Sequence, residues 1–167
     1  MLEFQYARLL YNALFFTVVV GLTVGISASP RLLAATALST SRTLYAVNQS
    51  APSRGSISVY DINRGHSLLK TIPTVSDVDD VKGVAVTAAT GKLYVTYRAR
   101  SGVGKIYCLS IHDDAVLWDR VIDPGVDRLS IHPNGKLLYV PTWEGGSADY
   151  INVLNADNGD VVRKAFF

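Results

Sequence analysis

Beyond about residue 40, apolar and polar residues alternate in short runs that are separated by turn residues. In LSIHPNGKLLYVPTW, residues 129–143, Leu129 and Ile131 alternate with polar residues, and so do Leu138 and Val140. Alternation with a period of two, rich in β-branched and aromatic side chains, is typical of half-buried strands. The pattern therefore predicts short β-strands rather than helices.

Two of these strand pairs are joined by turns that contain glycine. The run HPNG, residues 132–135, places Pro at the first corner of the turn and Gly where the backbone becomes left-handed. An earlier stretch, VAVTAATGKLYVTYR, residues 84–98, repeats the pattern with Gly91 at its corner. Each stretch predicts a β-hairpin.

Three sequence features recur with the same spacings, 49 and then 45 residues. LYAV, LYVT and LYVP begin at Leu44, Leu93 and Leu138. ISVYD, IYCLS and INVLN begin at Ile57, Ile106 and Ile151. A turn position follows eight residues later, at Gly65, Asp114 and Gly159. Self-similarity at a fixed spacing indicates a repeat architecture.

Each repeat unit is predicted to hold four strands. In the middle unit they are residues 83–87, 92–97, 105–110 and 115–122, and the first unit begins with LLAATAL at Leu32. A unit of about 40–45 residues with four short strands is typical of a β-propeller blade. We therefore expect an all-β fold, a partial β-propeller of about three four-stranded antiparallel blades at residues 32–74, 78–123 and 125–167, preceded by an N-terminal hydrophobic helix.

The repeat resembles the YVTN-type β-propeller family. The matching pieces are PNG at 133–135, LYVT at 93–96, ISVYD at 57–61 and NGDVV at 158–162. The Asn that ends the family motif is present only as Asn48, with Tyr97 and Thr142 at the corresponding positions. The resemblance runs from about Leu32 to the C-terminus and implies a bacterial exported propeller, related to lactonase-like propellers and to the propeller chains of quinoprotein amine dehydrogenases.

The number of units is small for a propeller. Propellers typically close with about four to eight blades, because each blade buries its apolar faces only against its neighbours. We therefore expect three blades to form part of a longer propeller, as a fragment, a truncated product or a protomer that needs further blades. Open blade edges also predict self-association.

The N-terminal segment predicts export. Residues 9–28 carry no charge, and Arg8 precedes them. Residues 1–29 therefore form a signal peptide, for which cleavage after Ala28 fits the repeat best, or an uncleaved membrane anchor. The expected location is the periplasm or the extracellular space, with a membrane-anchored form as the alternative, and contact with the membrane only through this segment.

Charge and cysteine content exclude several classes of protein. The 16 Lys and Arg and 14 Asp and Glu residues give a formal net charge of +2 and are scattered, so no nucleic-acid surface is expected. Cys108 is the only cysteine, which excludes an intrachain disulfide and a CxxC metal site. Its position in a third strand predicts a small buried apolar side chain.

The sequence contains no HExxH, GxSxG or GxxxxGK[ST] motif, and we predict no catalytic residue, metal site or cofactor. The acidic run at Asp77, Asp79 and Asp80 lacks the Gly and distal Glu of an EF-hand. Candidate ligand-binding residues are instead expected on loops that join second to third strands and fourth strands to the next unit: Lys82, Arg98, Asp127, Arg128, Trp143 and Glu144. Trp143 and Glu144, on a Gly-rich loop, suit stacking on and hydrogen bonding to a sugar or peptide.

Three functions remain open at this point. The first is an exported, non-catalytic propeller that binds a protein partner or a small ligand on its loops. The second, implied by the family resemblance, is hydrolysis of a sugar lactone, and the third is a role as propeller subunit of a quinoprotein dehydrogenase. Turnover of a gluconolactone would distinguish the second from the first.

Overall fold

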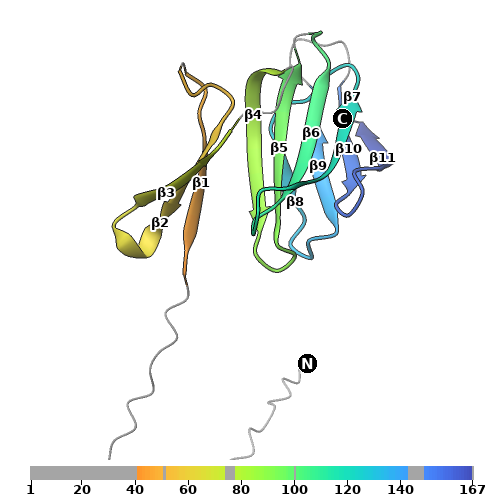
Figure 1. Ribbon diagram of the computed structural model, residues 1–167. Helices are drawn as coiled ribbons and strands as arrows, with labels where there is room; N and C mark the ends of the chain where they lie inside the picture. Colours follow the sequence, from red (N-terminus) through yellow and green to blue (C-terminus); the bar gives the residue numbers. More distant parts are fainter. Residues whose placement is uncertain (1–40, 51, 74–77, 100, 143–148, 167) are drawn as a thin grey trace, which may run out of the picture. The chain divides into compact units, whose positions relative to one another are not determined.

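The computed structural model describes residues 41–50, 52–73, 78–99, 101–142 and 149–166. These residues form three antiparallel sheets, coloured orange to yellow, green and blue in Figure 1. The first sheet contains β1 (Thr43–Val47), β2 (Ile57–Asp61) and β3 (Ser67–Ile72). The middle sheet contains β4 (Val78–Thr87), β5 (Lys92–Ala99), β6 (Gly104–Ser110) and β7 (Val116–Ile122). The third sheet contains β8 (Ser130–Ile131), β9 (Leu137–Pro141), β10 (Tyr150–Asn155) and β11 (Val161–Phe166).

Within each sheet the strands follow chain order and pair with their sequence neighbours, in the orders β1-β2-β3, β4-β5-β6-β7 and β8-β9-β10-β11. A 3-10 helix, η1 (Ile62–Arg64), fills the turn between β2 and β3, and Asp61 caps it by accepting hydrogen bonds from two backbone amides. The all-β prediction with four-stranded antiparallel units is therefore confirmed for the middle and third sheets. The predicted hydrophobic helix at 9–28 and the predicted strand at Leu32 lie outside the described residues.

The predicted turn position is confirmed in all three repeats. Gly65, Asp114 and Gly159 adopt left-handed backbone conformations, with φ values of +63°, +61° and +76°. This conformation suits Gly, and Asp tolerates it better than most residues with a side chain. A backbone hydrogen bond near this turn also recurs in every repeat and ties the turn to the preceding hairpin. The amides of Ile62, Ile111 and Ala156 donate it to the carbonyls of Arg42, Gly91 and Lys136.

A β-bulge also recurs at the same place in each sheet. Pairing with the outer strand changes register after Val59, Cys108 and Val153, which are related by the 49- and 45-residue spacings. A bulge increases the local twist of the strand pair. The sequence repeat therefore specifies the irregular features of the sheets as well as their strands.

The first strand of the middle sheet is longer than predicted. We expected it to begin at Gly83, but β4 begins at Val78 and pairs with β5 as far as Ala99. Two register shifts, between Val78 and Asp80 and between Val81 and Gly83, allow this extension. Sequence alternation missed it because a bulge breaks the period of two.

Two apolar clusters hold the sheets together. One joins residues of the first and middle sheets, among them Ile57, Val59, Val81, Leu93 and Val95. The other joins the middle and third sheets: Tyr94, Ile106, Cys108, Trp118, Ile122, Val126, Leu138, Val140, Leu154 and Ala156. Each sheet therefore buries its apolar side chains against the next sheet along the chain, as expected for a stacked repeat.

Cys108 lies in the second of these clusters and is fully buried. Burial raises the pKa of its thiol to about 11. Its repeat equivalents, Val59 and Val153, are buried as well. The prediction that Cys108 serves as a small apolar side chain is confirmed.

Candidate functional site

The loops expected to bind a ligand lie at one edge of each sheet, which we call the loop face. Because neighbouring strands run antiparallel, β1, β5 and β9 end at this edge, and β2, β6 and β10 begin there. The turns at Gly65, Asp114 and Gly159 lie at the opposite edge. Loops carried on a rigid sheet are common positions for binding residues.

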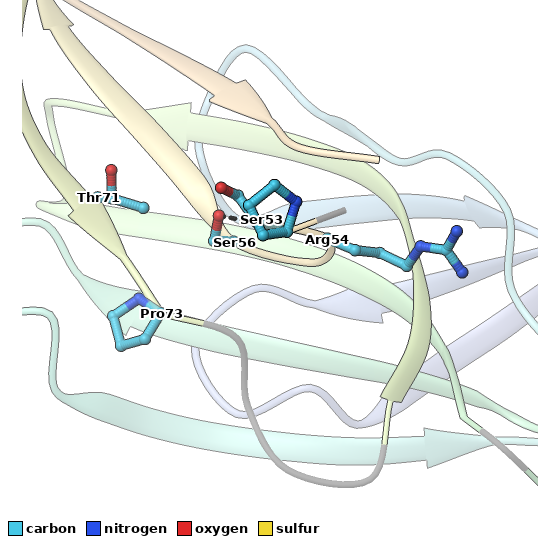
Figure 2. A pocket seen from close by; sticks show the side chains of 6 residues that line it. Ser53, Arg54, Ser56, Thr71 and Pro73 are labelled. Atoms are coloured by element: carbon cyan, nitrogen blue, oxygen red, sulfur yellow. Dashed lines mark hydrogen bonds between the residues drawn. The ribbon is translucent and has the colours of Figure 1, made fainter. Parts of the chain in front are cut away.

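The loop face of the first sheet contains a hollow of about 330 Å³, which we call the loop hollow. Figure 2 shows how the residues after β1 and those at the end of β3 surround it. Its lining consists of Pro52, Ser53, Arg54, Ser56, Thr71 and Pro73. Three hydroxyl groups, those of Ser53, Ser56 and Thr71, thus lie around two rigid proline rings, a combination that suits a polar group of a ligand.

Asn48 holds the loop that forms this hollow. Its backbone amide donates to the carbonyl of Ser56 over 2.9 Å, and its carbonyl accepts from the amide of Gly55 over 2.7 Å. Its side-chain amide donates to the hydroxyls of Ser56 and Ser58 over 2.9 and 3.0 Å. The Ser56 hydroxyl in turn donates to the carbonyl of Ser53 over 2.6 Å, the dashed contact in Figure 2. Asn48 thereby ties the two ends of the loop together.

The middle sheet supports the same loop from its side. The hydroxyl of Tyr97 donates to the carbonyl of Gly55 over 3.3 Å, and the side chain of Gln49 donates to the carbonyl of Val81 over 3.2 Å. Burial, followed by the neighbouring Tyr107, raises the pKa of Tyr97 to about 12, so its hydroxyl remains protonated and able to donate. The loop hollow is therefore built before any ligand arrives.

Two of the predicted ligand-binding residues lie together at the loop-face end of the middle sheet. Lys82 forms a 3.1 Å ion pair with Asp80, which lies opposite Arg98 in the pairing of β4 with β5. The structure thus brings Lys82 and Arg98 to the same end of the sheet, where Asp80 pairs with the Lys82 ammonium group.

Asp127 and Arg128 lie elsewhere, in the segment that leads into β8. The backbone of Asp127 accepts a hydrogen bond from the Thr96 hydroxyl over 2.8 Å and donates to Pro141 over 3.1 Å. Arg128 lines a second hollow of about 220 Å³, on the third sheet. These two residues therefore belong to the contact between sheets and to a separate surface. Trp143 and Glu144 lie outside the described residues.

Sequence reasoning missed the lining of the loop hollow, including Arg54 and Thr71. The available signal was the polar run NQSAPSRGS at residues 48–56, between two predicted strands. Among the described residues, no three His, Cys, Asp or Glu side chains gather as a metal site would require. Within the same ranges no helix has the length and apolar character needed to cross a bilayer.

Comparison of the fold with solved structures gives three informative matches. Hydrazine synthase from Kuenenia stuttgartiensis has a TM-score of 0.59 and 22% identity, over 75% of this chain and 32% of that one. BamB from Moraxella catarrhalis has a TM-score of 0.51 and 19% identity, over 74% and 34% of the two chains. The Dos1 propeller has a TM-score of 0.53 and 12% identity, over 75% and 31%. The chain thus spans about a third of the length of these structures.

The three sheets match β-propeller blades. We call them the first blade (β1–β3), the middle blade (β4–β7) and the third blade (β8–β11). No protein-family profile matches the sequence, and no curated protein matches it significantly. The likeness to solved structures therefore shows the fold, and the function has to be argued from the surfaces of the blades.

Proposed function

We propose that this chain is an exported, non-catalytic propeller of the YVTN type that binds a protein partner or a small ligand on its loop face. The observation that carries the proposal is the loop hollow, which is lined by three hydroxyl groups and supported by the hydrogen bonds of Asn48. A rigid polar hollow lowers the entropic cost of binding because the loop is already ordered. Export rests on the N-terminal segment, residues 1–29.

Tyr97, which supports the loop of the hollow, acts through hydrogen bonding. Burial raises its pKa to about 12, so its hydroxyl is neutral at physiological pH and donates to the backbone of Gly55. A general base needs a pKa near the working pH, which Tyr97 does not have.

Photo-crosslinking tests the binding role. A photoreactive amino acid at Ser53, in the loop hollow, is expected to give a specific adduct in native cells. The same group at Asp113, an exposed turn residue at the opposite edge of the middle blade, serves as the control and is expected to give none. Substitution Thr71→Lys, which fills the hollow, should remove the Ser53 adduct.

Three outcomes would contradict the proposal. Equal adducts from both positions would show that the loop face is not selective, and the absence of any adduct would remove the binding role. Hydrolysis of a gluconolactone by the purified protein would indicate the lactonase alternative. A reporter fused after Ala37 tests export separately, since it should appear outside the cytoplasm.

A further inference from the structure

The second hollow lies on the side of the third blade that faces away from the middle blade in the repeat. It is lined by Arg128, Leu129, Ser130, Tyr139, Pro141 and Ile151. One repeat of 45 residues earlier, the same positions in the middle blade are Gly83, Val84, Ala85, Tyr94, Thr96 and Ile106. We call the six third-blade residues the blade groove.

In the middle blade, Gly83, Tyr94, Thr96 and Ile106 receive the third blade. The Tyr94 hydroxyl donates to the carbonyl of Ala156 over 3.1 Å, and Thr96 donates to the carbonyl of Asp127 over 2.8 Å. A Cβ at Gly83 would come within 3.0 Å of the backbone of Arg128, so the backbones of the middle and third blades approach closely there. Tyr94, Thr96 and Ile106 are fully buried by this contact, with exposed fractions of 0%. Their equivalents in the blade groove, including Tyr139 and Ile151, remain partly exposed.

The outer strands show a second feature of the blade-to-blade contact. Lys70, Trp118 and Arg163 occupy one repeat position, because they lie opposite Val59, Cys108 and Val153 in the strand pairing. Each of the first two reaches the left-handed turn of the next blade. Lys70 binds both carboxylate oxygens of Asp114, at 2.7 and 2.8 Å, and the Trp118 ring lies where a Cβ on Gly159 would be 2.6 Å away.

Arg163 is the third member of this set and is exposed on β11. The other cation of this set, Lys70, is matched by a carboxylate at the turn of the next blade, that of Asp114. The first blade carries Gly65 at the turn position, with the exposed Arg64 and His66 beside it. A second copy that offered its first blade would therefore bring Gly65, which has no carboxylate to pair with Arg163, to this position.

From these contacts we infer that the blade groove and Arg163 form the docking surface for a further blade of the same propeller, one that carries an acidic residue at the turn position of Asp114. The inference rests on charge complementarity and on continuity with the contact already formed between the middle and third blades. It is independent of the ligand proposed for the loop face. The sequence predicted that Arg128 binds a ligand, and the inference instead places Arg128 in the contact between blades.

The test extends the full chain by one blade. A copy of residues 78–122, which supplies an Asp114 equivalent, is appended after Phe167, where it continues the 45-residue register. Ser130→Cys places a thiol in the blade groove at an exposed position, and native Cys108 is buried and gives little background. The appended copy of Cys108 is changed to Val, the residue at the equivalent positions 59 and 153. Docking should slow labelling of the Ser130→Cys thiol by about tenfold or more, because the reagent then reaches the thiol only when the contact between the two blades opens.

Charge exchange makes the test specific. Arg163→Glu in the extended chain should restore fast labelling, and a further change of the appended Asp114 copy to Lys should slow it again. The matched control changes the neighbouring copy of Asp113 to Lys, which should not rescue. A Ser67→Cys reporter on the first blade should label at the same rate throughout.

Two results would overturn the inference. The first is equal labelling of the Ser130→Cys thiol with and without the appended blade. This result counts against docking even if the appended blade stays unfolded, because residues 78–122 fold against the first blade in the parent chain. Concentration-dependent protection of the Ser130→Cys thiol in the parent chain, together with a sedimenting dimer, would assign the blade groove to a second copy.

Discussion

The left-handed turn position has a different environment in each blade. A Cβ on Gly65 would meet nothing within 4 Å, whereas a Cβ on Gly159 would lie 2.6 Å from the Trp118 ring. At the same position Asp114 has a side chain and uses it to bind Lys70. The three blades therefore share the left-handed backbone conformation, and the side chain at this position depends on the blade that packs against it.

We expect Gly159→Ala to destabilise the chain more than Gly65→Ala. Both substitutions place a side chain in the left-handed region, which costs about 1–2 kcal/mol. Only at Gly159 must the Trp118 ring also move, which adds about 1–3 kcal/mol. Urea unfolding of the two variants measures the difference, and equal losses would show that Trp118 yields without cost.

Cys108 predicts how stability depends on alkaline pH. Its pKa is raised by burial to about 11 in the folded chain, above the value of 9.0 for an unperturbed thiol. The unfolded state therefore loses its proton first, and stability that is fully present below pH 9 is lost as the pH rises toward 11. The loss from this group is at most about 2–3 kcal/mol.

Cys108→Val tests this prediction, because Val occupies the equivalent positions 59 and 153. The variant should fold normally and lose less stability between pH 9 and 11 than the parent chain. Tyr94 and Tyr97, whose pKa values burial raises above 10.0, remove stability above pH 10 from both chains. Denaturant unfolding at several pH values gives the two curves. Parallel curves would mean that the thiol ionises equally in both states.

At the scale of elements, side-chain hydrogen bonds join the middle and third blades. Tyr94→Phe removes the donor to the buried Ala156 carbonyl and should cost about 1–2 kcal/mol. Tyr139→Phe, at the same repeat position on the partly exposed blade groove, is the matched control and should be nearly neutral. Thermal or urea unfolding compares the two, and a neutral Tyr94→Phe would show that water replaces the lost donor.

Strands and turns were predictable because they depend on local alternation and on turn residues at fixed offsets. Asp114 was placed at its turn by spacing alone, in a position otherwise held by Gly. The close approach of Val126 to Gly104, where a Cβ would lie 2.6 Å from the Val126 backbone, has no sequence signature because it joins segments that meet only after folding. The loop hollow was missed for the same reason, since Asn48 acts through contacts with the serines across its loop.

At the scale of the whole molecule, large apolar side chains are exposed mainly on the outer strands β3, β7 and β11. The exposed members there are Leu68, Leu69, Val116, Leu117, Val121, Val161, Val162 and Phe166. Exposed apolar strands at a sheet edge offer both side chains and unpaired backbone groups to another chain. This arrangement supports the expected self-association and assigns it to the outer strands rather than to the blade groove.

Residues 39–167 form a compact unit and are suited to a test of this assignment. We expect this segment to self-associate, and the pair Leu117→Lys and Val162→Lys to shift it toward monomer in sedimentation velocity, because charge on an edge strand opposes pairing. Both side chains are at least half exposed, so stability should change by less than about 0.5 kcal/mol. Leu44→Lys, an exposed position on the inner strand β1, is the control and should leave association unchanged. A parent segment that stays monomeric at all concentrations, or oligomers that the outer-strand lysines do not weaken, would show that these strands are not the associating surface.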